Sequence, residues 1–202
     1  MLIHPWDQGQ TDDQWIDFVR AQGFAQLVAG GYGRLYPVIV PTQFVMMSPR
    51  DIVLHLARPS PIWAAIEENP TVALSVAGDW AFIRSDWKAI GEEDPRRGVP
   101  TTYYAAVQLI CTATVFDDIE VKAAILDAQL LESQPGVDAI DPEEHGTLLK
   151  GIRGLGLRIH DVRDKFKFGG NVDTAHRIAI RDRLVEQGGA AAGAVAHIDI
   201  GQ

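Results

Sequence analysis

Short apolar runs rich in β-branched residues recur along the chain, and several of them alternate apolar with polar positions. Alternation with a period of two is typical of a strand that buries one face. The stretch GGYG at 30–33 separates the first two runs and favours a hairpin. The pattern predicts strands at 24–29, 34–40, 51–57, 71–77, 80–85, 99–116 and 154–168.

Other stretches have helical spacing instead. Trp15, Phe18 and Val19 share one face of the first of them. Asp117 or Asp118 can cap a second sizeable helix, which follows the long central strand. The pattern predicts helices at 11–22, 60–68, 118–132, 143–150 and 173–187.

The order of these elements predicts the fold class. Strands do not alternate regularly with helices, which argues against a parallel doubly wound sheet. Many short strands with a few interspersed helices fit a mainly β (α+β) protein, built as an antiparallel β-barrel with peripheral helices. We expect one domain over residues 1–187 and a flexible C-terminal tail over 188–202, because the tail has no periodicity.

Composition favours a compact protein of the cytoplasm. Apolar residues make up 47% of the 202 residues, enough for one domain with a sizeable core. No apolar run reaches membrane-spanning length, and the N-terminus lacks the basic-then-apolar pattern of a secretion signal. The single cysteine, Cys111, cannot form an internal disulfide. We therefore expect a cytoplasmic location and no membrane segment.

Charge is distributed unevenly along the chain. The net charge of −9 argues against a broad nucleic-acid surface, which needs clustered lysine and arginine. Residues 150–183 nevertheless hold nine basic residues and only four acidic ones. Such a segment on an acidic protein suits a small anionic ligand or an acidic patch of a partner, with ordinary solvated surface as the alternative.

Familiar catalytic and metal-binding motifs are absent from the sequence. It has no HExxH, CxxC, Walker, GxSxG or GxGxxG pattern, and its six histidines lack the spacing of a zinc site. We therefore predict no metal site. No reaction follows from these motifs, so whether the protein is an enzyme stays open.

Four clusters of polar and aromatic residues lie at expected strand ends. In the first, at 55–63, Arg58 stands beside the free backbone N–H groups of a helix start, which favours an anion. In the second, at 80–87, alternation puts Trp80 and Phe82 on one face, where they can stack on a planar ligand. For both clusters, core packing or plain solvation is the alternative.

The other two clusters are richer in hydrogen-bond donors. Pro100 fixes the chain before four hydroxyl side chains at 101–104, which would cost energy in a core without partners. At 165–171, Lys165 and Lys167 share a strand face, and two glycines after them permit close backbone approach. At a pocket mouth these groups can bind a phosphate or a ring edge. The alternative for 101–104 is that the hydroxyls only hydrogen-bond to backbone groups nearby. The alternative for 165–171 is that the lysines only protect a strand edge from pairing with another chain.

In this order the clusters resemble the PaiB-type FMN-binding negative transcriptional regulators, a family of split β-barrels similar in fold to pyridoxamine-phosphate oxidases. The similarity spans about residues 1–187. The family patterns G-H-x-A-R-x-N-P-x-W, Y-I-S-P-x-W, V-P-T-W-N-Y-x-A-V, K-G-I and K-x-K-L-S-Q-N-R correspond to residues 54–63, 82–87, 99–107, 150–152 and 165–172.

The resemblance implies a split antiparallel β-barrel, a homodimer, and FMN bound at the interface between the two subunits. It also implies which residues contact this flavin nucleotide or a similar planar anion. By matching position, the cofactor-binding residues are His55, Arg58, Ser60, Trp63, Ser85, Trp87, Thr101, Thr102, Tyr103, Lys165, Lys167 and Asn171.

The sequence departs from the family pattern at several positions. Gly169 and Gly170 stand where the family has Ser-Gln, Val172 replaces its Arg, and Ser60 replaces its Asn. Some polar contacts to FMN are therefore missing, so a split barrel that has lost FMN stays an alternative. Further alternatives are a flavin- or NAD(P)H-dependent oxidoreductase and a heme-binding variant with a ligand among His55, His160 and His176.

The family name points to a regulator. The acidic net charge and the lack of a basic helix-turn-helix favour action through a partner over direct DNA binding. These hypotheses share one structural prediction: the cationic stretch 150–183 folds back beside the entrance of the strand 99–116. There it would form a cradle for a flat anion between two subunits.

Overall fold

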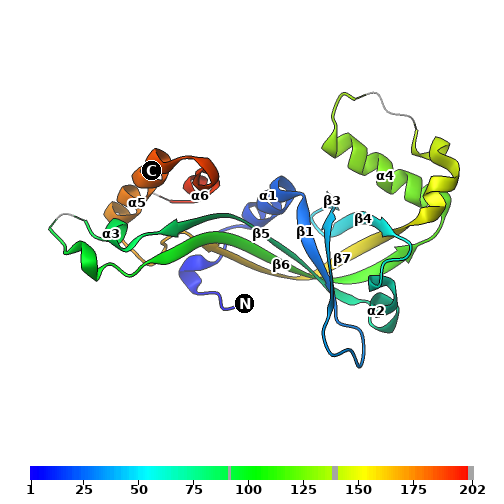
Figure 1. The fold of residues 1–202 in the computed structure, drawn as a ribbon, viewed down its shortest axis with the longest axis horizontal. Coiled ribbons are helices and arrows are strands. Elements are labelled where there is room, and N and C mark those ends of the chain that lie inside the picture. Colours follow the sequence, from blue (N-terminus) through cyan, green and yellow to red (C-terminus); the bar gives the residue numbers. More distant parts are fainter. Residues whose placement is uncertain (91, 138–140, 200–202) are drawn as a thin grey trace. The chain divides into compact units, whose positions relative to one another are not determined.

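The computed structural model describes residues 1–90, 92–137 and 141–199. Over these residues a seven-stranded sheet has the order β2-β1-β5-β6-β7-β4-β3 (Figure 1). The pairs β1–β2, β1–β5, β3–β4 and β4–β7 are antiparallel. The strands are β1 (Phe24–Ala29), β2 (Val38–Gln43), β3 (Val45–Ser48), β4 (Asp51–Ala57), β5 (Thr71–Ile83), β6 (Thr101–Phe116) and β7 (Ile152–Lys167).

The five predicted helices correspond to α1, α2, α4, η3 and α5, of which η3 is a 3-10 turn, whereas α3 was not predicted. The Asp118 side chain accepts a hydrogen bond from Val121 N, so Asp118 rather than Asp117 caps α4. None of the described helices combines the length and the apolar character needed to cross a membrane. The helices are α1 (Asp12–Gln22), α2 (Ile62–Glu68), α3 (Ser85–Lys88), α4 (Ile119–Ser133), α5 (Thr174–Gln187) and α6 (Ala192–Ala196), with 3-10 turns η1 (Pro5–Asp7), η2 (Pro95–Arg97), η3 (Pro142–Gly151) and η4 (Gly189–Ala191).

The α+β class is confirmed, and three strand predictions need correction. The strand expected at 34–40 begins only at Val38, because Leu35 and Tyr36 lie in an exposed loop. The two strands expected at 71–77 and 80–85 are one strand, β5, which contains Asp79 at φ +49°. Aspartate tolerates this left-handed conformation better than most residues, so the strand can bend without ending. The short strand β3 was not predicted.

The chain divides into two compact units. Unit 1 comprises Met1–Trp15, Ala77–Val107 and Arg163–Gln202, and unit 2 comprises Ile16–Val76 and Gln108–Val162. The long strands β5, β6 and β7 contribute residues to both units. Each unit therefore draws its sheet from segments that lie far apart in the sequence.

Unit 2 contains β1 to β4 together with parts of the three long strands. Helix α4 packs along β4 and against η3 (Figure 1). Leucines from successive strands are fully buried, and each contributes about 1.5–3 kcal/mol relative to an exposed position. The inward alternation predicted for 51–57 is confirmed, since Ile52, Leu54 and Leu56 are the buried positions of β4.

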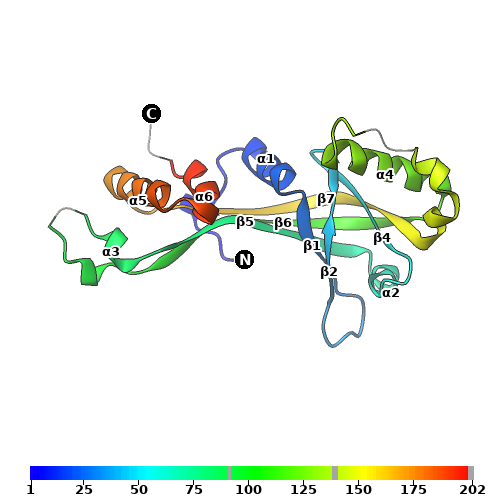
Figure 2. The ribbon, with the colours of Figure 1, turned by 45° about the horizontal axis from the view of Figure 1, so that its top comes forward.

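Unit 1 carries the C-terminal helices. Helices α5 and α6 pack against each other (Figure 2), and Arg183 of α5 donates a hydrogen bond to the carbonyl of Asp86 in α3 at 2.8 Å. Within the tail expected at 188–202, residues 189–196 form η4 and α6, and Ala194 and Ile198 are buried. Residues 200–202 of that tail lie outside the described residues. A stretch composed largely of alanine and glycine shows no apolar–polar period, which is why the pattern did not predict these helices.

Candidate functional site

A cavity of about 390 Å³ lies within unit 1, at the entrance of β6. Four segments meet there: the N-terminal residues, α3, the start of β6, and the end of β7 with the loop after it. We call this the cationic cavity. It is lined by His4, Trp6, Asp7, Lys88, Val99, Pro100, Thr101, Tyr103, Lys165, Lys167, Gly169 and Asn171.

Two lysines of the cationic cavity influence each other. Lys167 Nζ donates a hydrogen bond to Thr101 Oγ1 at 2.7 Å. The pKa of Lys88 is lowered, first by burial and second by the positive charge of Lys167. An anion between these two ammonium groups would relieve their repulsion. The Thr101 hydroxyl accepts from Lys167, so its own hydrogen stays available for a ligand.

The third lysine, Lys165, is tied to the N-terminal segment. Its side chain is buried, and its Nζ donates to the carbonyl of Leu2 at 2.9 Å and lies 3.7 Å from Asp7 Oδ2. The next contact along the segment is Gly9 N, which donates to Asp164 Oδ2 at 2.8 Å. These contacts hold residues 1–9 along the end of β7, where they form one wall of the cavity.

The cavity also contains a buried hydroxyl group, that of Tyr103. Its side chain is 1% exposed, and its hydroxyl has no hydrogen-bond partner among the described residues. Burial raises the pKa of Tyr103 to about 12, a shift that the charge of Arg177 opposes and that of Asp7 assists. The phenol is therefore neutral near pH 7 and can donate a hydrogen bond. A buried polar group without a partner is costly, which points to a ligand or water atom that completes it.

The two glycines at 169 and 170 are explained by close approach. Gly169 has φ +85°, and a Cβ there would clash with the Tyr103 hydroxyl. A Cβ on Gly170 would clash with the carbonyl oxygen of Trp6. Tyr103 and the N-terminal segment occupy the space that side chains at 169 and 170 would need. This explains why glycines stand here where the family has Ser-Gln.

A flat aromatic surface adjoins the lysines. The rings of His4 and Trp6 are stacked, with centroids 4.7 Å apart and an angle of 9° between their planes. Trp6 is 50% exposed although it lines the cavity. The cavity therefore combines ammonium and hydroxyl donors with a ring surface, and its one carboxylate, Asp7, lies beside Lys165. This set can bind an anion that carries a planar group.

The predicted juxtaposition of the cationic stretch and the β6 entrance is confirmed by the Lys167–Thr101 hydrogen bond. Four lining residues were not anticipated. Lys88 lies in a short helix next to Trp87, which could have drawn attention to it, whereas nothing in the N-terminal segment signalled a cavity wall. The predicted residues gathered here are Thr101, Tyr103, Lys165, Lys167 and Asn171, and the additional ones with polar or aromatic side chains are His4, Trp6, Asp7 and Lys88.

Three other predicted residues of unit 1 do not line the cationic cavity. Thr102 alternates with Thr101 and Tyr103 along β6, so its side chain lies on the opposite face of the strand. Ser85 begins α3, and its carbonyl packs tightly against Gly98. Trp87 lines a separate hollow that includes Arg183 of α5.

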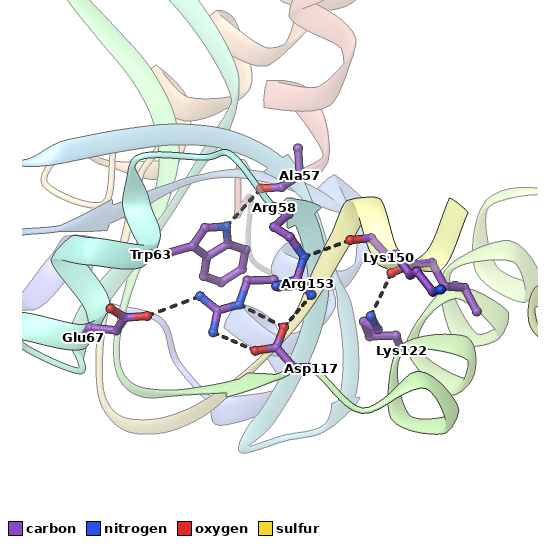
Figure 3. Close-up of polar contacts among 9 residues, drawn as sticks. Ala57, Arg58, Trp63, Glu67, Asp117, Lys122, Lys150 and Arg153 are labelled. Atoms are coloured by element: carbon purple, nitrogen blue, oxygen red, sulfur yellow. Dashed lines mark hydrogen bonds and ion pairs between the residues drawn. The ribbon is translucent and has the colours of Figure 1, made fainter. Parts of the chain in front are cut away.

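In unit 2, Arg58 is held by protein groups (Figure 3). Its Nε donates to the carbonyl of Lys150 and its Nη2 to Asp117 Oδ1, both at 2.8 Å. Arg153 donates to the other oxygen of Asp117 at 2.8 Å and lies 3.3 Å from Glu67. Hydrogen bonds from Arg153 and Arg58, in that order, lower the pKa of Asp117. Both guanidinium groups thus have carboxylate partners.

The remaining predicted residues of unit 2 also have structural contacts. Trp63 is buried, its indole donates to the carbonyl of Ala57 at 2.9 Å, and Arg153 lies over its ring at 5.1 Å (Figure 3). His55 Nδ1 lies 2.5 Å from Gln129 Oε1. Ser60 does not cap α2 through its side chain. Its backbone N–H donates to the carbonyl of Ala57.

A buried lysine in unit 2 was not anticipated from the sequence. Lys122 of α4 is 1% exposed, and its Nζ donates to the carbonyl of Leu149 at 2.7 Å (Figure 3). This contact fastens α4 to the end of η3. Its partner is a backbone carbonyl inside unit 2, so we read Lys122 as structural.

Among the described residues, no group of three histidine, cysteine or acidic side chains is placed to hold a metal ion. The three histidines considered for heme have polar side-chain neighbours. His55 contacts Gln129, His160 Nε2 lies 2.6 Å from Thr112 Oγ1, and His176 Nδ1 lies 3.0 Å from Asp173 Oδ1.

Solved structures share the fold of this chain. The FAD and heme binding protein from Mycobacterium smegmatis aligns with a TM-score of 0.62 at 21% identity, covering 81% of this chain and 74% of that protein. The flavocytochrome Anf3 from Azotobacter vinelandii aligns with a TM-score of 0.59 at 18% identity, covering 80% and 69%. The fold class predicted from the sequence, a split β-barrel, is confirmed.

Sequence comparison points to the same group. Protease synthase and sporulation protein PAI 2 of Bacillus subtilis is 22% identical over 180 residues, which cover 86% of this chain and 84% of that protein. The family model described as "Putative FMN-binding domain" matches residues 1–161. Because this match covers most of the chain, the protein belongs to the FMN-binding domain family that includes the PaiB-type proteins.

Proposed function

We propose that the protein binds FMN and holds the phosphate of FMN in the cationic cavity of unit 1. One observation carries the proposal: the buried Tyr103 hydroxyl lacks a partner among the described residues in a cavity that also contains Lys88 and Lys167. A phosphate monoester offers several acceptor oxygens and up to two negative charges, which match these donors. FMN supplies a redox-active ring when bound, and this chain's residues bind and orient it.

The aromatic wall supports the same ligand. The half-exposed ring of Trp6, backed by His4, offers a surface on which a planar ring can stack. Neutral Tyr103 and the Thr101 hydroxyl would donate to phosphate oxygens, while Lys88 and Lys167 would balance the charge.

A flavin titration tests the proposal. Flavin-free protein is titrated with FMN and, separately, with riboflavin, and binding is followed by quenching of flavin fluorescence. We expect saturable FMN binding that is about 100-fold tighter than riboflavin binding, because the phosphate makes several charge-assisted hydrogen bonds. Lys150→Ala removes an exposed lysine of unit 2 and should leave both affinities unchanged. No FMN binding, or equal affinity for riboflavin, would contradict the proposal.

We also propose that the protein is a homodimer. On β5, Trp80 and Phe82 are 61% and 55% exposed, while Ala81 and Ile83, which alternate with them, are buried. Neighbouring exposed aromatic rings on a strand favour coverage by a second copy. Sedimentation should give twice the chain mass, and Trp80→Lys combined with Phe82→Lys should shift the protein toward monomer. A wild-type monomer at micromolar concentration would refute the dimer.

We further propose a cytoplasmic regulatory role exerted through a protein partner. The net charge of −9 disfavours a DNA surface, and the Bacillus relative carries the name protease synthase and sporulation protein PAI 2. A salt-sensitive mobility shift with double-stranded DNA would overturn the preference for a protein partner.

A further inference from the structure

The C-terminal segment, residues 189–199, packs onto unit 1. Gly188 ends α5 with φ +62°, and η4 and α6 follow at once. Ala191, Ala194 and Ile198 are buried. These residues lie beyond residues 1–161, which the family model matches, so the family pattern gives this segment no role.

A polar contact between His197 and Asp79 links the segment to β5. His197 Nε2 lies 2.8 Å from Asp79 Oδ2, with the two side chains 17% and 26% exposed. Asp79 is the residue of β5 that has a positive φ, +49°. Gly193 of α6 approaches it so closely that a Cβ would clash with the Asp79 carboxylate. A residue with a side chain at position 193 would therefore not fit beside Asp79.

Aromatic contacts continue from His197 to the cationic cavity. The His197 ring stacks on Phe168, with centroids 4.7 Å apart and an angle of 18° between the planes, and it also contacts Phe166 at 5.6 Å. Phe168 in turn meets Tyr103 edge to face at 6.0 Å and 78°. Every step of this path lies within unit 1.

Packing has to orient Tyr103, because its hydroxyl has no hydrogen-bond partner among the described residues. Phe168 packs on the Tyr103 ring and directly precedes Gly169, the residue against which the Tyr103 hydroxyl lies. A change in the position of Phe168 would therefore move both the ring and the backbone that confines it.

We infer that the C-terminal segment is a latch that positions Tyr103 for the phosphate ligand, through the stack of His197 on Phe168. The inference rests on the proposed function, since it assigns His197 as a positioning residue of the same cavity. His197 does not line the cavity and acts only through its neighbours. Binding of FMN should therefore depend on a residue that does not touch the ligand.

A double-mutant cycle tests the latch. His197→Ala should weaken FMN binding about five- to tenfold, the size expected for losing an aromatic stack and a hydrogen bond. In a Tyr103→Phe background the same substitution should change FMN affinity less than twofold, because the hydroxyl to be positioned is already gone. A general loss of structure would weaken binding equally in both backgrounds, and equal effects would overturn the latch.

Two further variants separate the contacts. His197→Phe keeps a ring on Phe168 and should retain most of the affinity, and it remains informative if His197→Ala does not fold. Asp79→Asn keeps a polar acceptor and tolerates positive φ, so its FMN affinity should stay near that of the wild type. The matched control is His160→Ala on β7 in unit 2, which should leave FMN affinity unchanged.

Hydrogen–deuterium exchange gives a readout without ligand. In His197→Ala, exchange should rise in peptides covering 101–107 and 163–171, whereas in His160→Ala it should not. If wild-type protein binds no FMN, the proposed function falls, and this exchange result alone decides whether the latch exists. Unchanged exchange in both peptides would overturn the latch even if FMN binds.

Discussion

Two groups of cations, the arginines Arg58 and Arg153 of unit 2 and the lysines Lys88 and Lys167 of unit 1, have different partners. In unit 2, Arg58 and Arg153 share the carboxylate of Asp117, and Arg153 also contacts Glu67. In unit 1, Lys167 has a neutral partner, the Thr101 hydroxyl, and the burial of Lys88 disfavours its charge. Carboxylates balance Arg58 and Arg153 within the protein, whereas Lys88 and Lys167 would gain from an added anion.

This difference shows why the type of a residue does not reveal its role. Arg58 matches a family pattern and carries a fixed charge, yet its hydrogen-bonding groups are engaged by Asp117 and a backbone carbonyl. Lys88 matches none of the family patterns, yet it lines the cavity. A cation that already has a carboxylate partner contributes to the fold. A partly buried cation without a carboxylate partner is the better candidate for binding an anionic ligand.

The largest effect should come from unit 2 and fall on stability. Trp63→Ala removes a buried indole and the surface on which Arg153 lies, and should lower the free energy of unfolding by about 3–5 kcal/mol. Denaturant titration measures this change. Arg58→Ala serves as a comparison that should cost less stability, because Arg58 is the half-exposed member of the arginine cluster formed by Arg58, Arg153 and Asp117. A fall in FMN affinity of more than tenfold in folded Trp63→Ala would place the arginine cluster in the ligand site. The ligand would then not be specific to the cationic cavity of unit 1.

The next effect should come from unit 1 and fall on ligand affinity. Lys88→Ala combined with Lys167→Ala should raise the Kd for FMN about 100-fold, because two charge-assisted contacts to phosphate are lost. Isothermal titration calorimetry provides the Kd. Arg58→Ala is the matched cation from unit 2 and should change the Kd less than twofold. The reverse ranking of the two variants would show that the family-derived role of Arg58 was right.

Tyr103→Phe should separate binding from stability. Loss of the hydroxyl should weaken FMN binding about tenfold, since one hydrogen bond to a charged ligand is removed. The free energy of unfolding without ligand should stay the same or rise by up to about 1 kcal/mol, because the lost group has no partner among the described residues. Thermal melts with and without FMN measure both quantities. A clear loss of stability in the apo protein would mean that the hydroxyl already has a structural partner.

The smallest effect should be the acid sensitivity of the arginine cluster. The Asp117 pKa lies below its usual 3.8, so this carboxylate stabilises the fold above that pH, and the contribution disappears as pH falls through the lowered pKa. Asp117 is half exposed, which limits the contribution to less than about 1 kcal/mol. Melting temperatures from about pH 6 to pH 2 should converge for wild type and Asp117→Asn at the acid end. A constant difference across this range would assign the effect to packing instead of charge.

Particular residues show how far the sequence could lead. Alternation along β4 predicted its buried positions, and the capping aspartates Asp118 and Asp173 begin α4 and α5 close to the expected positions. The meeting of Lys167 with Thr101 was also predicted, because both belong to clusters at strand ends. The N-terminal wall of the cavity was not, because His4 and Trp6 reach it through contacts with β7 that no local pattern encodes.

The sequence by itself determined the strand and helix order, the fold class and the two donor-rich segments of unit 1, because these depend on local periodicity, capping and composition. Only the tertiary structure decided which cations are neutralised: Asp117 lies 59 residues from Arg58 and 36 from Arg153, and such pairings exist only once the strands are assembled. The same holds for Tyr103, whose hydroxyl has no partner among the described residues because of how Phe168, Gly169 and the N-terminal segment pack around it. Burial and pairing are properties of the packed chain, and they set which side chains remain available to a ligand.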